Sequence, residues 1–127
     1  MRKHSNCGAI LAAVVLTAVA TAAPVSAHHG WSEYQAEQSE ITGTLETPVS
    51  LAGPHATAQV RAGDELWDVV LAPSTRTAAA GLTEDTIPVG ATVTASGHRH
   101  LDEGTLEIKT ERLTWNGTVF DVYPERN

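Results

Sequence analysis

Short runs of alternating apolar and polar residues succeed one another from residue 41 to residue 115, and single Gly or Pro residues separate them. In the run Ile41–Thr47 every second side chain from Ile41 to Leu45 shares one side, which is the period of a half-buried β-strand. Gly43 stands in the middle of this run, where a glycine is typical of a bulge or a sharp bend. The pattern restricts the chain to a fold of short strands.

Four further runs have the same character, and one has helical features. Turn-forming residues follow the second run and predict a hairpin with the third, and Ser74 and Gly81 suit the N-cap and the end of a short helix. Asn116-Gly117 matches a glycosylation acceptor, but we interpret it as a turn. The expected elements after the first strand are strands at His55–Arg61 and Leu66–Leu71, a helix at Ser74–Ala80, and strands at Ala91–Gly97 and Thr105–Trp115.

Three strands, a helix and two strands is the element order of an OB-fold. We therefore predict an all-β domain: a small, five-stranded, OB-like, partly open barrel with one short helix between strands three and four. About 100 residues are enough for one such domain with a small core.

The first 27 residues have the three parts of a secretory leader. Arg2 and Lys3 are followed by an apolar run, Ala9–Ala23, and by the small-residue sequence Val25-Ser26-Ala27. The apolar run is shorter than the roughly 20 residues that a membrane span needs, so a stable membrane anchor is the weaker interpretation. We predict a cleaved signal peptide at residues 1–27, a single domain at 28–127, and a periplasmic or secreted location.

The charge balance argues against a nucleic-acid partner. Loss of the leader removes Arg2 and Lys3 from the 8 basic residues and none of the 15 acidic residues, so the formal charge changes from −7 to −9. A phosphate backbone selects for clustered Lys and Arg, which an acidic domain lacks. The single cysteine, Cys7, lies in the leader, so the mature chain is expected to have neither a disulfide nor a thiolate metal site.

The position of the histidines is the main chemical signal. Cleavage after Ala27 makes His28 the first residue, so its α-amine and its imidazole can chelate one metal ion. Nitrogen donors favour Cu(II) among the common divalent ions. Cleavage one residue earlier would place His29 third and would also suit Cu(II). The alternative is that His28 and His29 belong to a solvated N-terminus without a metal.

Three more histidines are candidate ligands. His98 and His100 lie two apart at the end of a predicted strand, so both rings can face one ion. His55 follows Pro54 at a strand entrance. The alternatives are an exposed polar strand end for the first pair and a hydrogen bond to the loop backbone for His55. The full candidate metal set is His28, His29, His55, His98 and His100.

Motifs for catalysis are absent from the sequence. It contains no serine nucleophile elbow and no glycine-rich phosphate loop, and its one thiol is in the leader. Most of its acidic residues alternate outward along the predicted strands, as expected for a solvated face. We therefore predict that the protein is not an enzyme.

Several short motifs occur in a characteristic order. They are Ala27-His28-His29-Gly30-Trp31, Ile41-Thr42-Gly43-Thr44-Leu45, Gly53-Pro54-His55, Ala78–Leu82 and Gly97-His98-Arg99. In this order the chain resembles the exported bacterial family called domain of unknown function 6152, over nearly all of the mature chain. It departs from the family pattern at Gly53, where Asn is usual, and at His98, where an aromatic is usual. The resemblance implies a small exported β domain and brings no established activity.

Two hypotheses follow. In the first, an exported module holds Cu(II) through His28, His29 and His55, for buffering or delivery. In the second, a periplasmic binding or accessory domain uses the barrel face, without metal, to hold an envelope protein partner or a small ligand. A copper monooxygenase is disfavoured, because a chain of this size with few aromatic residues offers little substrate surface.

Overall fold

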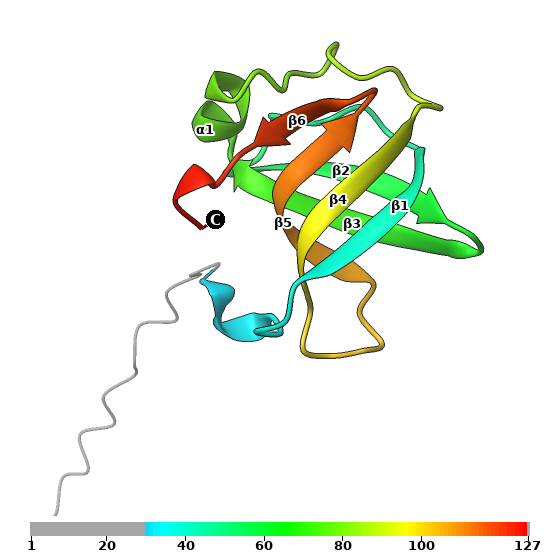
Figure 1. Cartoon of the computed structure of the whole chain (residues 1–127), viewed down its shortest axis with the longest axis vertical. Coiled ribbons are helices and arrows are strands. Elements are labelled where there is room, and N and C mark those ends of the chain that lie inside the picture. Colours follow the sequence, from blue (N-terminus) through cyan, green and yellow to red (C-terminus); the bar gives the residue numbers. More distant parts are fainter. Residues whose placement is uncertain (1–29, 127) are drawn as a thin grey trace, which may run out of the picture.

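The computed structural model describes residues 30–126, so the predicted leader and two candidate ligands, His28 and His29, lie outside the described residues. Six strands and one short α-helix make up the domain (Figure 1). In chain order the elements are the 3₁₀-helix η1 (Trp31–Glu33), β1 (Ser39–Leu45), β2 (His55–Ala62), β3 (Glu65–Pro73), α1 (Ser74–Ala79), β4 (Thr92–Arg99), β5 (Glu107–Trp115), β6 (Thr118–Asp121) and the 3₁₀-helix η2 (Pro124–Arg126).

The strands close into a barrel, which confirms the predicted fold class. The sheet order is β3-β2-β1-β4-β5-β6, and a parallel pairing of β3 with β5 joins the two sides. The other pairings are antiparallel. Five strands therefore form a closed, mixed, OB-like barrel, with the helix between the third and fourth strands as the sequence predicts.

Two glycines allow neighbouring backbones to approach closely. A Cβ atom added to Gly43 would collide with the carbonyl oxygen of Arg61, and one added to Gly97 would collide with the carbonyl oxygen of Lys109. The expected bulge or bend at Gly43 is in fact a close crossing, because β1 pairs with β4 at Gly43 and with β2 from the next residue. The register shift in this part of the barrel lies instead beside Gly97, between β4 and β5.

The core fills the barrel with aliphatic side chains from each of the strands β1 to β5. The largest of those fully shielded from solvent include Leu45, Leu71, Ile108 and Leu113. Strand β5 is unusual because Lys109, Thr110 and Glu111 are also buried. Both faces of β5 are therefore covered at these positions, and the polar residues there need partners inside the protein.

The structure has one strand that was not predicted, and one local prediction is wrong. Residues 118–121, which follow the turn, form the additional strand β6 against β5. Ser74 is the first helical residue and not the N-cap, and its hydroxyl donates a hydrogen bond to the carbonyl oxygen of Gly53 at 2.7 Å. The turn itself is confirmed, because Asn116 and Gly117 both have positive φ, as a two-residue hairpin turn requires.

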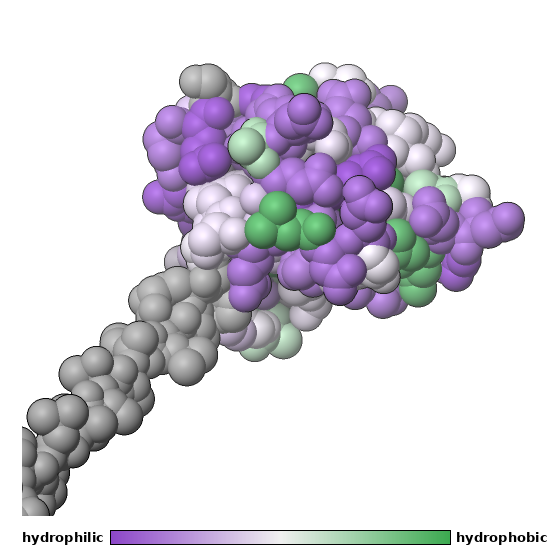
Figure 2. Space-filling view, turned by 90° about the horizontal axis from the view of Figure 1, so that it is seen from below, coloured by the Kyte–Doolittle hydropathy of each residue, from purple (hydrophilic) through white to green (hydrophobic). Residues whose placement is uncertain are grey.

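The described surface is mainly polar. Figure 2 shows hydrophilic residues over most of one face, with small hydrophobic patches between them. The large hydrophobic residues that are most exposed, Val89, Leu101 and Val119, come from three separate parts of the chain, and such single residues are common on soluble domains. None of the helices in residues 30–126 has the length and apolar character needed to cross a membrane.

Candidate functional site

Residues 30–38, which we call the N-terminal strap, cross one end of the barrel beside the end of β4. The backbone N–H of Gln35 donates to the carbonyl oxygen of Arg99 at 2.8 Å, and that of Leu101 donates to Glu33 at 2.8 Å. Tyr34 pairs with His100 in an isolated bridge. The start of the described chain is thus held at the end of β4 and at the loop that follows it.

Trp31 is the aromatic anchor of the strap. Its ring lies edge-on to His98 and to Tyr123, at centroid distances of 5.5 and 5.1 Å. The guanidinium carbon of Arg126 lies 3.9 Å from its centroid, and the Nζ of Lys109 lies 4.8 Å away. Cations over an indole ring are attracted by its negative face, so Trp31 joins the strap, β5 and η2.

His98, one of the predicted metal ligands, has contacts inside the protein at both ring nitrogens. Its Nδ1 lies 2.9 Å from the carbonyl oxygen of Gln35, and its Nε2 lies 2.8 Å from Oε1 of Glu111. Both ring nitrogens therefore face oxygen atoms of the protein. Only 7% of His98 is exposed, so a metal ion would have to displace buried hydrogen bonds.

Glu111 lies at the centre of this buried polar cluster. The side chains of Arg126 and Gln38 donate to its carboxylate at 3.1 and 2.8 Å, in addition to the contact with His98. Glu111 is only 1% exposed, so the expectation that acidic side chains point outward fails here. The carboxylate links β5 to both ends of the described chain.

His100 has a different environment from that of His98. Its Nδ1 accepts a hydrogen bond from the backbone N–H of Asp102 at 3.0 Å, and its ring lies edge-on to Tyr34 at 5.6 Å. Nδ1 would have to give up this hydrogen bond in order to bind a metal. The predicted shared ion between His98 and His100 is therefore not supported by their contacts.

His55 and His100 nevertheless line one cavity of about 470 Å³, which we call the strap cavity. His55 is half-buried at the first position of β2 and pairs with Pro73 in the ladder. Within residues 30–126, no three histidine, aspartate or glutamate side chains are grouped closely enough to hold a metal ion. The side chains that matter below for this cavity are Tyr34, His55, Val70, His100, Glu107 and Lys109.

A tyrosine, a carboxylate and a lysine meet in the strap cavity, and the sequence analysis did not single out any of them as site residues. The hydroxyl of Tyr34 donates to Glu107. Burial and then the hydrogen bond to Glu107 raise the pKa of Tyr34. Burial and then the charge of Arg126 lower the pKa of Lys109, although Glu107 and Glu33 act in the opposite direction. The one available signal was a lysine beside Ile108 in the middle of a predicted strand.

The raised pKa of Tyr34 predicts a loss of stability at alkaline pH. A group whose pKa is raised on folding stabilises the folded state fully below its unfolded pKa, 10.0 here, and loses that contribution as the pH rises above it. We expect the wild type to lose more stability than Tyr34→Phe between about pH 9 and about pH 11. Denaturant unfolding of both proteins over this pH range measures the difference. An equal loss of unfolding free energy in the two proteins would contradict the raised pKa of Tyr34.

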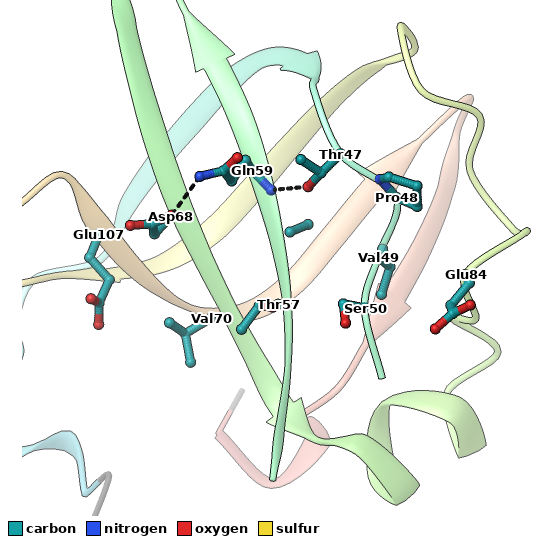
Figure 3. A pocket seen from close by; sticks show the side chains of 11 residues that line it. Thr47, Pro48, Val49, Ser50, Thr57, Gln59, Asp68, Val70, Glu84 and Glu107 are labelled. Carbon is teal, nitrogen blue, oxygen red and sulfur yellow. Dashed lines mark hydrogen bonds between the residues drawn. The ribbon is translucent and has the colours of Figure 1, made fainter. Parts of the chain in front are cut away.

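A second hollow adjoins the strap cavity on the outer face of β2 and β3. This β2–β3 groove has a volume of about 630 Å³ and shares Thr57, Val70 and Glu107 with the strap cavity. Figure 3 shows Asp68 and Glu107 at one end of it and Glu84 at the other. Gln59 lies between them and donates to Asp68 at 3.2 Å. Carboxylates and polar side chains thus line much of the groove.

No protein-family model matches the chain, and no curated protein is similar to it.

Proposed function

We propose that this protein is an exported metal-binding module in which His28, through its α-amine and ring, His29 and His55 hold one Cu(II) ion for buffering or delivery. The described residues offer no complete ligand set, so the proposal takes most of the donors from the two histidines that precede Gly30. His55 supplies the donor from the barrel.

The observation that carries the proposal is the position of the strap. Glu33 and Tyr34 line the same cavity as His55, and His29 is covalently joined to Gly30, immediately before η1. A 3₁₀ turn rises about 2 Å per residue, and an extended chain reaches at most about 3.6 Å per residue. His28 is therefore separated by only a short length of chain from Glu33, which lines the cavity.

The charge of the domain and the predicted export agree with this role. The acidic mature chain attracts cations. A new α-amine exists only after cleavage of the leader, so the proposed site would form after export and not in the cytoplasm. The resemblance to an exported family supports the same location.

Titration of the exported, cleaved protein with Cu(II), followed by electron paramagnetic resonance, tests the proposal. We expect one-to-one binding with nitrogen ligands, and at least about tenfold weaker binding in His55→Ala, which corresponds to about 1.4 kcal/mol. A protein that retains Ala27 is the matched control, because it moves His29 to the third position and should change the spectrum. Equal, weak binding by the wild type and by the double variant His28→Ala, His29→Ala would refute the proposal.

A second candidate function is a binding module that uses the barrel face without a metal. It is favoured by the place of the two hollows, which share three lining residues, lie on β2 and β3 and are bordered by the β1–β2 and β4–β5 loops. OB-folds bind oligonucleotides and oligosaccharides at this face. The carboxylates there disfavour a nucleic acid, so a neutral oligosaccharide is the better fit.

Nuclear magnetic resonance titration with short neutral oligosaccharides tests the second candidate. We expect amide shift changes concentrated at Thr57, Val70 and Glu107, because these residues border both hollows. Val70→Arg should abolish the changes, because it places a long, charged side chain on the wall that both hollows share. Changes spread evenly over the barrel, or none, would reject it.

A further inference from the structure

Lys109 is an unusual residue for a small barrel. It is the only lysine after the leader, since the sequence contains just Lys3 and Lys109. It is 1% exposed, although lysine is almost never fully buried, and it borders the strap cavity. Its Nζ lies 4.8 Å from the ring centroid of Trp31 and 5.6 Å from that of Tyr34. The strap therefore covers an amine at the inner wall of a cavity.

A proton-carrying pair lies beside this amine. Glu107 is two residues before Lys109 on β5, and side chains two apart share one face of a strand. Glu107 accepts the hydroxyl hydrogen of Tyr34, and both residues line the strap cavity. The cavity thus combines an amine with groups that can give and take a proton.

The electrostatic surroundings favour a nucleophilic amine. Burial and the nearby Arg126 lower the pKa of Lys109, and a second cation and desolvation are the two usual means of activating a lysine. Among the charged groups that face it, Glu107 and Glu33 act in the opposite direction. An amine with a lowered pKa reacts with carbonyl groups more readily than an exposed lysine at neutral pH.

We propose that Lys109 is the covalent attachment site for a small aldehyde or ketone that enters the strap cavity. Nζ attacks the carbonyl carbon, a C–N bond forms, and the carbonyl oxygen takes up a proton to give a carbinolamine. The nitrogen then loses one proton, the hydroxyl takes up a second proton, and the C–O bond breaks so that water leaves. Loss of the remaining proton from nitrogen completes the balance, in which amine and carbonyl give imine and water. The Tyr34–Glu107 pair supplies and recovers the proton, and the condensation needs no oxidant or reductant.

This inference goes beyond the copper proposal and does not depend on it. The reaction uses Lys109 and requires no metal, so it is tested in the presence of a chelator. Failure of copper binding leaves the imine test unchanged, and failure of the imine test leaves copper binding unchanged.

The test is reductive trapping on the mature, metal-free protein. Propionaldehyde and sodium cyanoborohydride are added at neutral pH, and peptide mass mapping measures the rate of alkylation at Lys109 in the folded chain and in guanidinium chloride. We expect labelling to be at least about tenfold faster in the folded chain, because the fold activates the amine. Slower labelling in the folded chain would overturn the proposal, because burial would then only protect the amine.

Two variants distinguish a loss of the reaction at Lys109 from a loss of the folded structure. Lys109→Arg keeps a cation under Trp31 and should lose all labelling at position 109, while the N-terminal amine still reacts as an internal reference. Tyr34→Phe keeps the ring and removes the hydroxyl, and we expect labelling of Lys109 to slow by about tenfold or more, since a positioned acid contributes to proton transfer. Labelling of Tyr34→Phe at the wild-type rate, with unchanged circular dichroism, would contradict the role of the pair.

Discussion

Replacement of Glu111 by Gln is expected to destabilise the folded protein by about 3–5 kcal/mol, the usual cost of breaking a buried charge pair by changing one partner. Glu111 is 1% exposed, and its carboxylate faces the donors of His98, Arg126 and Gln38. The amide of Gln carries no charge, and its NH₂ group would meet other donors. A domain of this size has a total stability of about 5–15 kcal/mol, so the loss is large.

Denaturant unfolding followed by tryptophan fluorescence measures this effect. The matched control is Glu46→Gln, which removes a carboxylate from the exposed pair with Arg61 and should cost no more than about 1 kcal/mol. The double variant Glu111→Gln, His98→Gln should be less destabilised than the sum of the two single variants, because the two side chains interact directly. Additive effects would show that Glu111 and His98 are not coupled.

The second large effect is expected at Gly97. A methyl group there would collide with the carbonyl group of Lys109 and lie 2.8 Å from the Cα of Thr110, and neither backbone atom can rotate away. We therefore expect Gly97→Ala to cost more than about 4 kcal/mol, which is exceptional for a single substitution. The closure of β4 on β5 would be lost first, and the buried residues of β5 would become exposed.

Gly63→Ala is the control that separates steric collision from backbone strain. Gly63 has a φ of +60° and no atom within 4 Å of an added Cβ, so alanine there costs only about 1–2 kcal/mol. Thermal unfolding and amide exchange in β4 and β5 compare the two variants. A Gly97→Ala protein with near wild-type stability would show that β4 and β5 can separate without loss of the fold.

Local sequence patterns were sufficient to predict the architecture. The alternation at Ile41–Leu45 and in the four later runs identified the barrel strands, and the turn residues at 62–65 identified the β2–β3 hairpin. Asn116-Gly117 identified a turn, but the strand β6 that follows it was not predicted. Gly81, with a φ of +94°, follows the helix where a C-terminal glycine was expected. These features depend on residues close together in the chain, so the period of the side chains and the chemistry of the turns carry the information.

The candidate site was predicted only in part. His55 and His100 were identified from their positions after Pro54 and at a strand end, and they do line one cavity. The pairing of His98 with His100 at one ion was not supported, because the i, i+2 rule describes an isolated strand and ignores what covers it. Glu111 and Gln35 cover His98, and no local pattern links these residues.

The sequence by itself determined the number and order of the barrel strands, the place of the helix and the acidic character of the domain. Only the tertiary structure decided that Lys109 and Glu111 are buried, because closure of the barrel brings the strap and η2 over β5. The physical reason is the range of the interactions. Strand periodicity and turns arise between near neighbours, whereas burial of a charge depends on groups more than 70 residues apart, such as Gln38 and Glu111.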